Sequence, residues 1–230
     1  MRIGGIQRFS LIDYPGKLSA VIFTQGCPFR CHYCHNPSLV LPSLFDSSYK
    51  EEDIFSFLFK RKDQLDAIVI TGGEPTQQKD LLFFLDKIKK LGYLVKLDTN
   101  GTNPQMVKEL IEKNLVDYIA MDIKAPIEKY ENIIGTKTDV SSILESINLL
   151  FLSSSIEYEF RTTIVPSFFQ KEDILSICHM IEKAPLFILQ NFVAKNTLNP
   201  LFLKEKSFSL KEMEMFQKLA RKFVKKCLIR

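Results

Sequence analysis

Short runs of β-branched and other apolar residues alternate along this chain with longer segments that have the spacing of amphipathic helices. The helix predicted over 78–91, for example, places its leucines and Ile88 on one apolar stripe, with lysines on the other face. Strands that alternate with helices favour parallel pairing, because each helix returns the chain to the same end of the sheet. The predicted strands are 19–24, 67–71, 93–97, 116–121, 157–165 and 186–189, and the predicted helices are about 50–62, 78–91, 104–113, 139–152, 171–183 and 209–226.

Six strand–helix units are fewer than the eight of a closed β/α barrel. The pattern therefore predicts an α/β fold with an open, partial (β/α)6 barrel of parallel strands. We expect a single domain over residues 1–230, with an N-terminal lead-in over about 1–18 and a C-terminal helical tail over about 200–230. In such folds the active site lies at the carboxyl ends of the strands.

Unusual polar clusters occur at the carboxyl ends of these predicted strands. Scattered surface residues would not all fall at one rim of a sheet, so we expect a functional site there. The clusters are a cysteine-rich segment from Cys27, then Gly72-Gly73-Glu74-Pro75, Asp98-Thr99-Asn100-Gly101, Asp122-Ile123-Lys124, Arg161 near the end of its strand, and Gln190-Asn191-Phe192.

Cys27, Cys31 and Cys34 have the spacing C-x3-C-x2-C. Three thiolates at this spacing can hold three corners of a cubane iron–sulfur cluster, whose irons are usually held by four cysteines. The remaining cysteines, Cys178 and Cys227, lie far along the sequence. One iron would then lack a protein ligand, and an open metal position can bind a substrate or cofactor. The spacing predicts a reactive cluster.

Other uses of these cysteines remain open. The run from Cys31 to His35 matches C-x-x-C-H, the haem attachment signature, although that reading leaves Cys27 unexplained and no export signal is visible. A zinc site could take His32 or His35 as its fourth ligand. A thioredoxin-like redox pair would leave the third cysteine without a role.

The composition is that of an ordinary globular chain, with 46% hydrophobic and 25% charged residues among 230. A net charge of +4 is too small to imply nucleic acid. No apolar run approaches the roughly 20 residues of a membrane helix, and the N-terminus lacks the apolar segment of a signal peptide. Five cysteines, three of them crowded together, favour metal chemistry over disulfides. We expect a cytoplasmic protein with no membrane or nucleic-acid partner.

The cysteine loop after the first strand, followed by Gly-Gly-Glu-Pro after the second, resembles the radical S-adenosylmethionine (SAM) enzymes. The run from Ser10 to Lys17, the run from Phe23 to Cys31, and Cys34-His35-Asn36-Pro37 are similar to the small activating-enzyme branch, and above all to the activating proteins of anaerobic ribonucleoside-triphosphate reductase. The resemblance extends from about residue 3 to about residue 200.

The resemblance implies an oxidoreductase whose [4Fe-4S] cluster, on Cys27, Cys31 and Cys34, gives one electron to SAM. The SAM C–S bond would break to give methionine and a 5′-deoxyadenosyl radical. That radical would take a hydrogen atom from a glycine of a partner glycyl-radical enzyme, with anaerobic ribonucleotide reductase as the first candidate. The electron would come from a flavodoxin- or ferredoxin-type donor. The protein would position the reactants and exclude water and oxygen.

Other substrates are compatible with the same chemistry. The chain could activate a pyruvate formate-lyase-type enzyme, or act on a small molecule as the 7-carboxy-7-deazaguanine synthases do. A non-catalytic zinc or iron–sulfur binding module is an alternative of a different class.

The resemblance also implies the residues that would hold SAM. Tyr33 would lie against the adenine. Gly72, Gly73 and Glu74 would meet the methionine amino group, and Glu74 could accept a hydrogen bond from it. Asp98 would reach the ribose or the sulfonium, whose positive charge a carboxylate stabilises.

Further along the rim, Asp122 and Lys124 match the Asp-x-Lys of the family. Lys124 could pair with the SAM carboxylate, and Arg161 could do the same or orient an acid. The alternative for each of these charged residues is a salt bridge with its neighbours at the rim.

Overall fold

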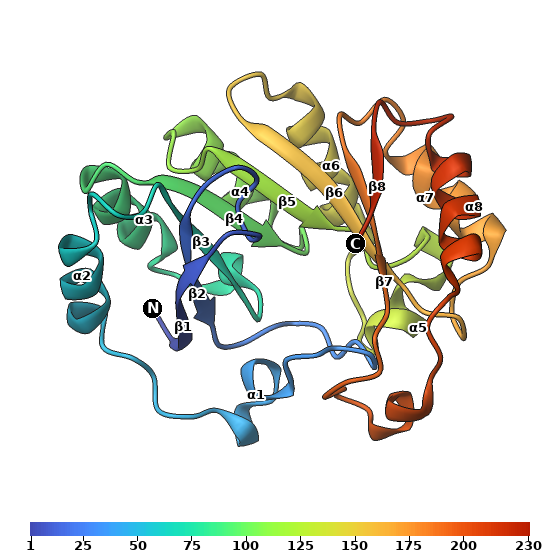
Figure 1. Cartoon of the computed structure of the whole chain (residues 1–230), viewed down its shortest axis with the longest axis horizontal. Coiled ribbons are helices and arrows are strands. Elements are labelled where there is room, and N and C mark those ends of the chain that lie inside the picture. Colours follow the sequence, from blue (N-terminus) through green and yellow to red (C-terminus); the bar gives the residue numbers. More distant parts are fainter.

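The computed structural model describes residues 1–230 and contains one eight-stranded sheet whose strand order follows the sequence (Figure 1). β1 pairs with β2 in the antiparallel sense, and every later neighbouring pair is parallel. β1 and β8 form the two edges and do not pair with each other, so the barrel is open, as predicted. The strands are β1 (Ile3–Ser10), β2 (Ser19–Thr24), β3 (Ala67–Gly72), β4 (Leu94–Thr99), β5 (Tyr118–Asp122), β6 (Glu157–Ile164), β7 (Phe187–Asn191) and β8 (Cys227–Ile229).

Helices follow the parallel strands and cover the outer face of the sheet (Figure 1). Several helices begin at residues whose side chains cap the helix N-terminus. Asn103 accepts from the Met106 amide at the start of α4, and Ser209 and Glu212 form a capping box on α8. The helices are α1 (Pro37–Val40), α2 (Glu51–Lys60), α3 (Leu81–Lys90), α4 (Pro104–Glu112), α5 (Tyr130–Ile134), α6 (Val140–Leu152), α7 (Lys171–Met180) and α8 (Leu210–Ala220).

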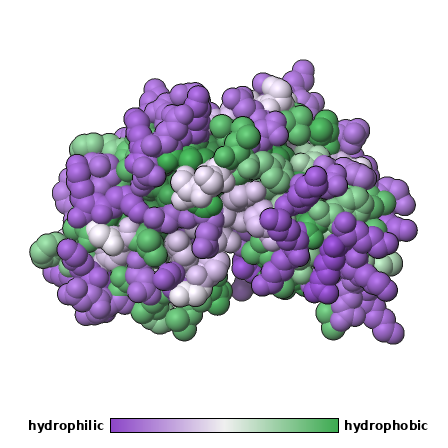
Figure 2. All heavy atoms as spheres, turned by 90° about the horizontal axis from the view of Figure 1, so that it is seen from above, coloured by the Kyte–Doolittle hydropathy of each residue, from purple (hydrophilic) through white to green (hydrophobic).

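The parallel strands are buried on both faces. Along β3, Ile68 and Ile70 belong to the large core cluster of 49 residues, while Ala67 and Val69 belong to a second cluster of six. This division follows from the alternation of side chains along a strand. The larger cluster lies between strands and helices. In Figure 2, hydrophilic residues gather around the periphery of the face shown, and paler and hydrophobic residues extend across its middle. None of the helices combines the length and apolar character that a bilayer-spanning segment needs.

All six predicted strands and all six predicted helices are present, but the two ends of the chain differ from expectation. Residues 1–18, predicted as a lead-in, contain β1 and a turn whose Tyr14 packs against Tyr118, with ring centroids 5.7 Å apart. The last helix was predicted over about 209–226, which is wrong at its end: α8 stops at Ala220, and the chain then forms β8 against β7. The C-terminal stretch is therefore not helical throughout.

Candidate active site

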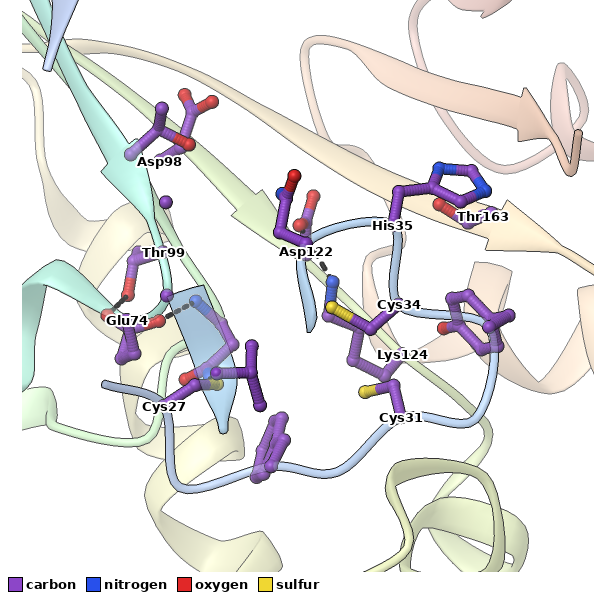
Figure 3. Close-up of a pocket in the computed structure, with 18 residues that line it drawn as sticks. Cys27, Cys31, Cys34, His35, Glu74, Asp98, Thr99, Asp122, Lys124 and Thr163 are labelled. Atoms are coloured by element: carbon purple, nitrogen blue, oxygen red, sulfur yellow. Dashed lines mark hydrogen bonds and ion pairs between the residues drawn. The ribbon is translucent and has the colours of Figure 1, made fainter. Parts of the chain in front are cut away.

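A cavity at the carboxyl ends of the parallel strands collects four of the six polar clusters that the sequence analysis singled out, those that follow β2, β3, β4 and β5 (Figure 3). The Gln190-Asn191-Phe192 cluster of β7 does not line it. The empty space of the cavity is about 860 Å³, part of it open to solvent. Arg161 is the one predicted site residue that does not line it. Ten of the eleven predicted residues do: Cys27, Cys31, Tyr33, Cys34, Gly72, Gly73, Glu74, Asp98, Asp122 and Lys124.

The three thiols belong to the loop between β2 and α1, residues 25–36, which we call the cysteine loop. In Figure 3 the Cys31 and Cys34 side chains point toward the side of the cavity where Cys27 lies. Arg30 shapes this loop from within, because its guanidinium donates to the Cys27 and Phe29 carbonyls, both at 2.7 Å. The loop backbone is thus fixed between two of the cysteines.

A second segment, residues 193–202, holds the cysteine loop from the β7 side. The Leu198 amide donates to the Cys34 carbonyl and the Asn199 amide to the His32 carbonyl, each at 2.9 Å. These bonds join stretches of chain that are far apart in the sequence, and they satisfy carbonyls next to two cysteines.

The two histidines that a zinc site would use are engaged elsewhere. The His32 ring stacks on Phe202 with centroids 5.9 Å apart and an interplanar angle of 7°. The His35 ring stacks on Phe192, and its Nε2 donates to the Val193 carbonyl at 2.8 Å. No group of three or more His, Cys, Asp or Glu side chains converges closely enough to hold one metal ion. The thiolates of a cubane bind separate irons, so they need not converge on one point.

Burial governs the protonation of two of the three thiols. It raises the pKa of Cys27 to about 12 and that of Cys31 to about 11, although Lys124 opposes the rise at Cys31. Metal ligands must be deprotonated, so metal binding at these cysteines would release protons. At Cys27 and Cys31 the uncharged thiol is therefore the stable form in the absence of a metal.

The glycine pair at the end of β3 lets two loops approach closely. Gly72 has φ +112°, and a Cβ there would lie 2.4 Å from the Thr24 nitrogen; a Cβ on Gly73 would lie 2.1 Å from the Gly26 oxygen. The Gly73 and Glu74 amides donate to the Thr24 and Gly26 carbonyls at 2.8 and 2.7 Å. Those amides therefore fix the start of the cysteine loop, whereas the Gly73 carbonyl accepts no hydrogen bond from the chain.

Glu74 is 1% exposed, and its carboxylate accepts four hydrogen bonds from the chain. Oε1 accepts from the Thr76 amide at 3.1 Å and from the Thr76 hydroxyl at 2.6 Å. Oε1 also accepts from the Thr99 hydroxyl at 2.7 Å, and Oε2 accepts from the Asn100 amide at 2.7 Å (Figure 3). Burial nevertheless raises the pKa of Glu74. The carboxylate ties the loop after β3 to the end of β4, where the Asn100 side-chain amide lies 3.9 Å from the Cys27 sulfur.

The charged residues at the rim form one ion-pair network. Asp98 binds Lys96 and, at 3.2 Å, Arg161; Asp122 binds Arg161 at 2.7 Å and Lys124 at 2.8 Å. Burial alone would raise the pKa of both carboxyls, but the neighbouring cations lower it below the usual range. Both acids are therefore ionised, and the salt-bridge alternative raised for Lys124 and Arg161 is present.

Tyr33 is nearly fully buried, and its hydroxyl has no hydrogen-bond partner in the chain. A buried donor without a partner suits a site that a ligand completes. Thr99, Asn100 and Thr163 also line the cavity but were not predicted as site residues. The first two belong to a motif that the sequence made visible, yet their bonds to Glu74 depend on tertiary structure.

The chain belongs to the radical SAM superfamily, whose family model matches residues 21–174. Within that superfamily it falls in the branch of the glycyl-radical activating enzymes. A Methanocaldococcus jannaschii protein, provisionally named a glycyl-radical enzyme activating enzyme, is 37% identical over 99% of this chain and 95% of its own length. The pyruvate formate-lyase-activating enzyme of Clostridium pasteurianum is 26% identical over 99% of this chain and 96% of its own.

Solved structures share the fold. Streptococcus suis SuiB bound to S-adenosylmethionine superposes with a TM-score of 0.68 at 15% sequence identity. The match covers 91% of this chain and 49% of the SuiB chain, so this chain spans about half the length of SuiB.

Enzymes of this family use a [4Fe-4S] cluster and SAM, and these are the cofactors of this chain. The donor set fits them. Three thiols without a fourth cysteine line one cavity that also presents an unpartnered hydroxyl, and Gly73 on its lining has an unpartnered carbonyl.

Proposed function

We propose that this enzyme holds its cluster on Cys27, Cys31 and Cys34 and activates a partner protein by generating a glycyl radical on it. The partner that we favour is anaerobic ribonucleoside-triphosphate reductase. The observation that supports the proposal is that the thiols, the glycine pair and the ionised acids, from separate strand ends, line one cavity. When bound, the cluster and SAM supply a one-electron cleavage that yields a 5′-deoxyadenosyl radical able to take a hydrogen atom from glycine.

The residues around the cavity have distinct proposed roles toward SAM. The Gly73 carbonyl accepts from the methionine amino group, because the Glu74 carboxylate is buried and already accepts four hydrogen bonds from the chain. Glu74 and Gly72 then act by fixing the loops. Lys124 pairs with the SAM carboxylate, and the Tyr33 ring borders the adenine.

The two aspartates of the network place negative charge near the sulfonium. Asp98 and Asp122 line the cavity, and Arg161 behind them keeps both ionised. A carboxylate close to a cationic sulfonium stabilises its binding where water is excluded. Arg161 is a positioning residue in this scheme, since it does not line the cavity.

A second candidate partner is a pyruvate formate-lyase-type enzyme. It is favoured by the full-length similarity to the Clostridium pasteurianum activating enzyme, which covers 99% of this chain. The architecture of the cavity suits either partner, because both reactions begin with the same attack on a glycine.

The test is anaerobic reconstitution with iron, sulfide and SAM, followed by incubation with each candidate partner. We expect a glycyl-radical signal by electron paramagnetic resonance in one partner, and no signal when the acceptor glycine of that partner is changed to alanine. SAM cleavage without a radical in either partner would show that the substrate belongs to another class.

A further inference from the structure

A second depression adjoins the cysteine loop, with about 1260 Å³ of empty space that includes open solvent. Cys27 is the one residue that lines both this depression and the active-site cavity. Cys27, a proposed cluster ligand, therefore borders both hollows, whose other lining residues differ. The other lining residues of the second depression are Met1, Arg2, Gln25, Gly26, Pro28, Gln77, Gln78, Lys79 and Asp80.

Hydrogen bonds between separate segments of the chain hold the shape of this depression. The Gln78 side chain accepts from the Arg2 amide at 3.0 Å and donates to the Gln25 carbonyl at 2.8 Å. The Gln25 amide in turn donates to the Arg2 carbonyl at 3.0 Å. Gln25 and Gln78 are buried, so these bonds tie the start of β1, the end of β2 and the segment after β3 into one fixed floor.

The charge on this surface is positive. Arg2 and Lys79 are exposed, and neither side chain makes an ion pair. Asp80 is the one acidic residue on the lining, and it is bound to the amino group of Met1. The remaining polar lining residues are glutamines, which leaves two cations free to meet an acidic surface.

We propose that an acidic one-electron carrier protein docks on this depression and reduces the cluster by way of Cys27. The inference rests on the proposed function, which requires an electron to enter while SAM and the glycine segment of the partner fill the first cavity. Electron tunnelling weakens steeply with distance, so a carrier must come close to a cluster ligand. One electron leaves the reduced centre of the carrier and enters the cluster, and no bond or proton is transferred.

The experiment compares the reconstituted wild-type enzyme with an Arg2→Glu/Lys79→Glu double variant. Reduced flavodoxin is mixed with each under anaerobic conditions, and the rate of cluster reduction is followed by the loss of cluster absorbance. At low salt we expect the double variant to be reduced at least about tenfold more slowly, because electrostatic steering of association is reversed. The difference should shrink as added salt screens the charges.

Two controls make the result specific. A Lys222→Glu/Lys226→Glu variant changes the charge by the same amount at two other exposed lysines and should be reduced at the wild-type rate. Photoreduced deazaflavin, a small reductant, should reduce all three proteins equally. Wild-type behaviour of the Arg2→Glu/Lys79→Glu variant with flavodoxin, or equal slowing of the control variant, would overturn the docking site.

The docking site and the proposed function can fail separately. Cluster reduction is measured without the glycyl-radical partner and without SAM turnover, so it tests the docking surface alone. If the wild-type enzyme accepts electrons from deazaflavin but cleaves no SAM, the proposed function is refuted, while the reduction rates still decide the docking surface.

Discussion

At the scale of single residues, Arg161 does not line the cavity itself, but it binds two acids that do. Its guanidinium binds Asp98 and Asp122, which come from β4 and β5, and it lies on β6 between neighbouring strands. The two acids line the cavity in ionised form because of this contact and because Lys96 and Lys124 bind their other oxygens. A buried, paired charge network is costly to break at one member.

Asp122→Asn tests this network by its pH dependence. The folded-state pKa of Asp122 is below its unfolded value, so its contribution to stability is present above the unfolded pKa and is lost as the pH falls. From about pH 6 to about pH 3, the unfolding free energy of the cluster-free wild type should therefore fall more steeply than that of the variant. Near neutral pH the variant should be less stable by about 2–4 kcal/mol.

Urea unfolding of the cluster-free proteins provides these free energies. Asp86→Asn is the matched control, since Asp86 pairs with Lys90 on the surface and its loss should cost less than about 1 kcal/mol. Parallel pH curves for wild type and Asp122→Asn would show that the network does not hold Asp122 in its ionised form.

At the scale of elements, short apolar runs predicted every parallel strand from β2 to β7. A strand that is buried on both faces has a nearly continuous apolar sequence, so it can be recognised from that sequence alone. The sequence did not predict β1, because Gly4 and Gly5 lower its strand propensity. Antiparallel pairing with β2 stabilises it as a strand in the folded chain. β8 was missed because it has three residues and follows a basic stretch of helical spacing. Tertiary pairing decides both edges.

The glycine pair belongs to the same scale, since it joins the loop after β3 to the end of β2. The sequence indicated a close approach of the backbone there, but it could not show that the approach is to Gly26 and Thr24 rather than to a ligand. Likewise, the motif around Asn100 was visible, whereas its contacts with Glu74 and Cys27 require the folded chain. Sequence spacing indicates which residues could form a site, whereas their contacts with one another depend on long-range hydrogen bonds in the folded chain.

Gly73→Ala should disrupt this junction. The added Cβ would lie 2.1 Å from the Gly26 oxygen, so one of the two loops must move, at a cost of more than about 2 kcal/mol in unfolding free energy. Iron retained per chain after reconstitution should fall as well, because Gly26 precedes Cys27. Gly5→Ala is the control: its Cβ would meet only the Phe23 side chain, at 3.6 Å or more, and stability and iron content should stay near wild type. Equal behaviour of the two variants would contradict this role for Gly73.

At the scale of the whole molecule, an open sheet brings segments from the first and last thirds of the chain to one rim. The cysteine loop is held by Arg30 from within, by the glycine pair on one side and by residues 193–202 on the other. Cys178 on α7 and Cys227 on the edge strand β8 do not line this cavity and are buried in the core. The fold thus separates three thiols that face a cavity from two that fill the interior.

The most direct measurement is the yield of 5′-deoxyadenosine from SAM under reducing, anaerobic conditions, with each cysteine replaced in turn. Cys27→Ala, Cys31→Ala and Cys34→Ala should each abolish the product together with cluster reconstitution, whereas Cys178→Ala should retain both. Production of 5′-deoxyadenosine by the Cys31→Ala protein at a rate near that of wild type would contradict a cluster held by these three thiols.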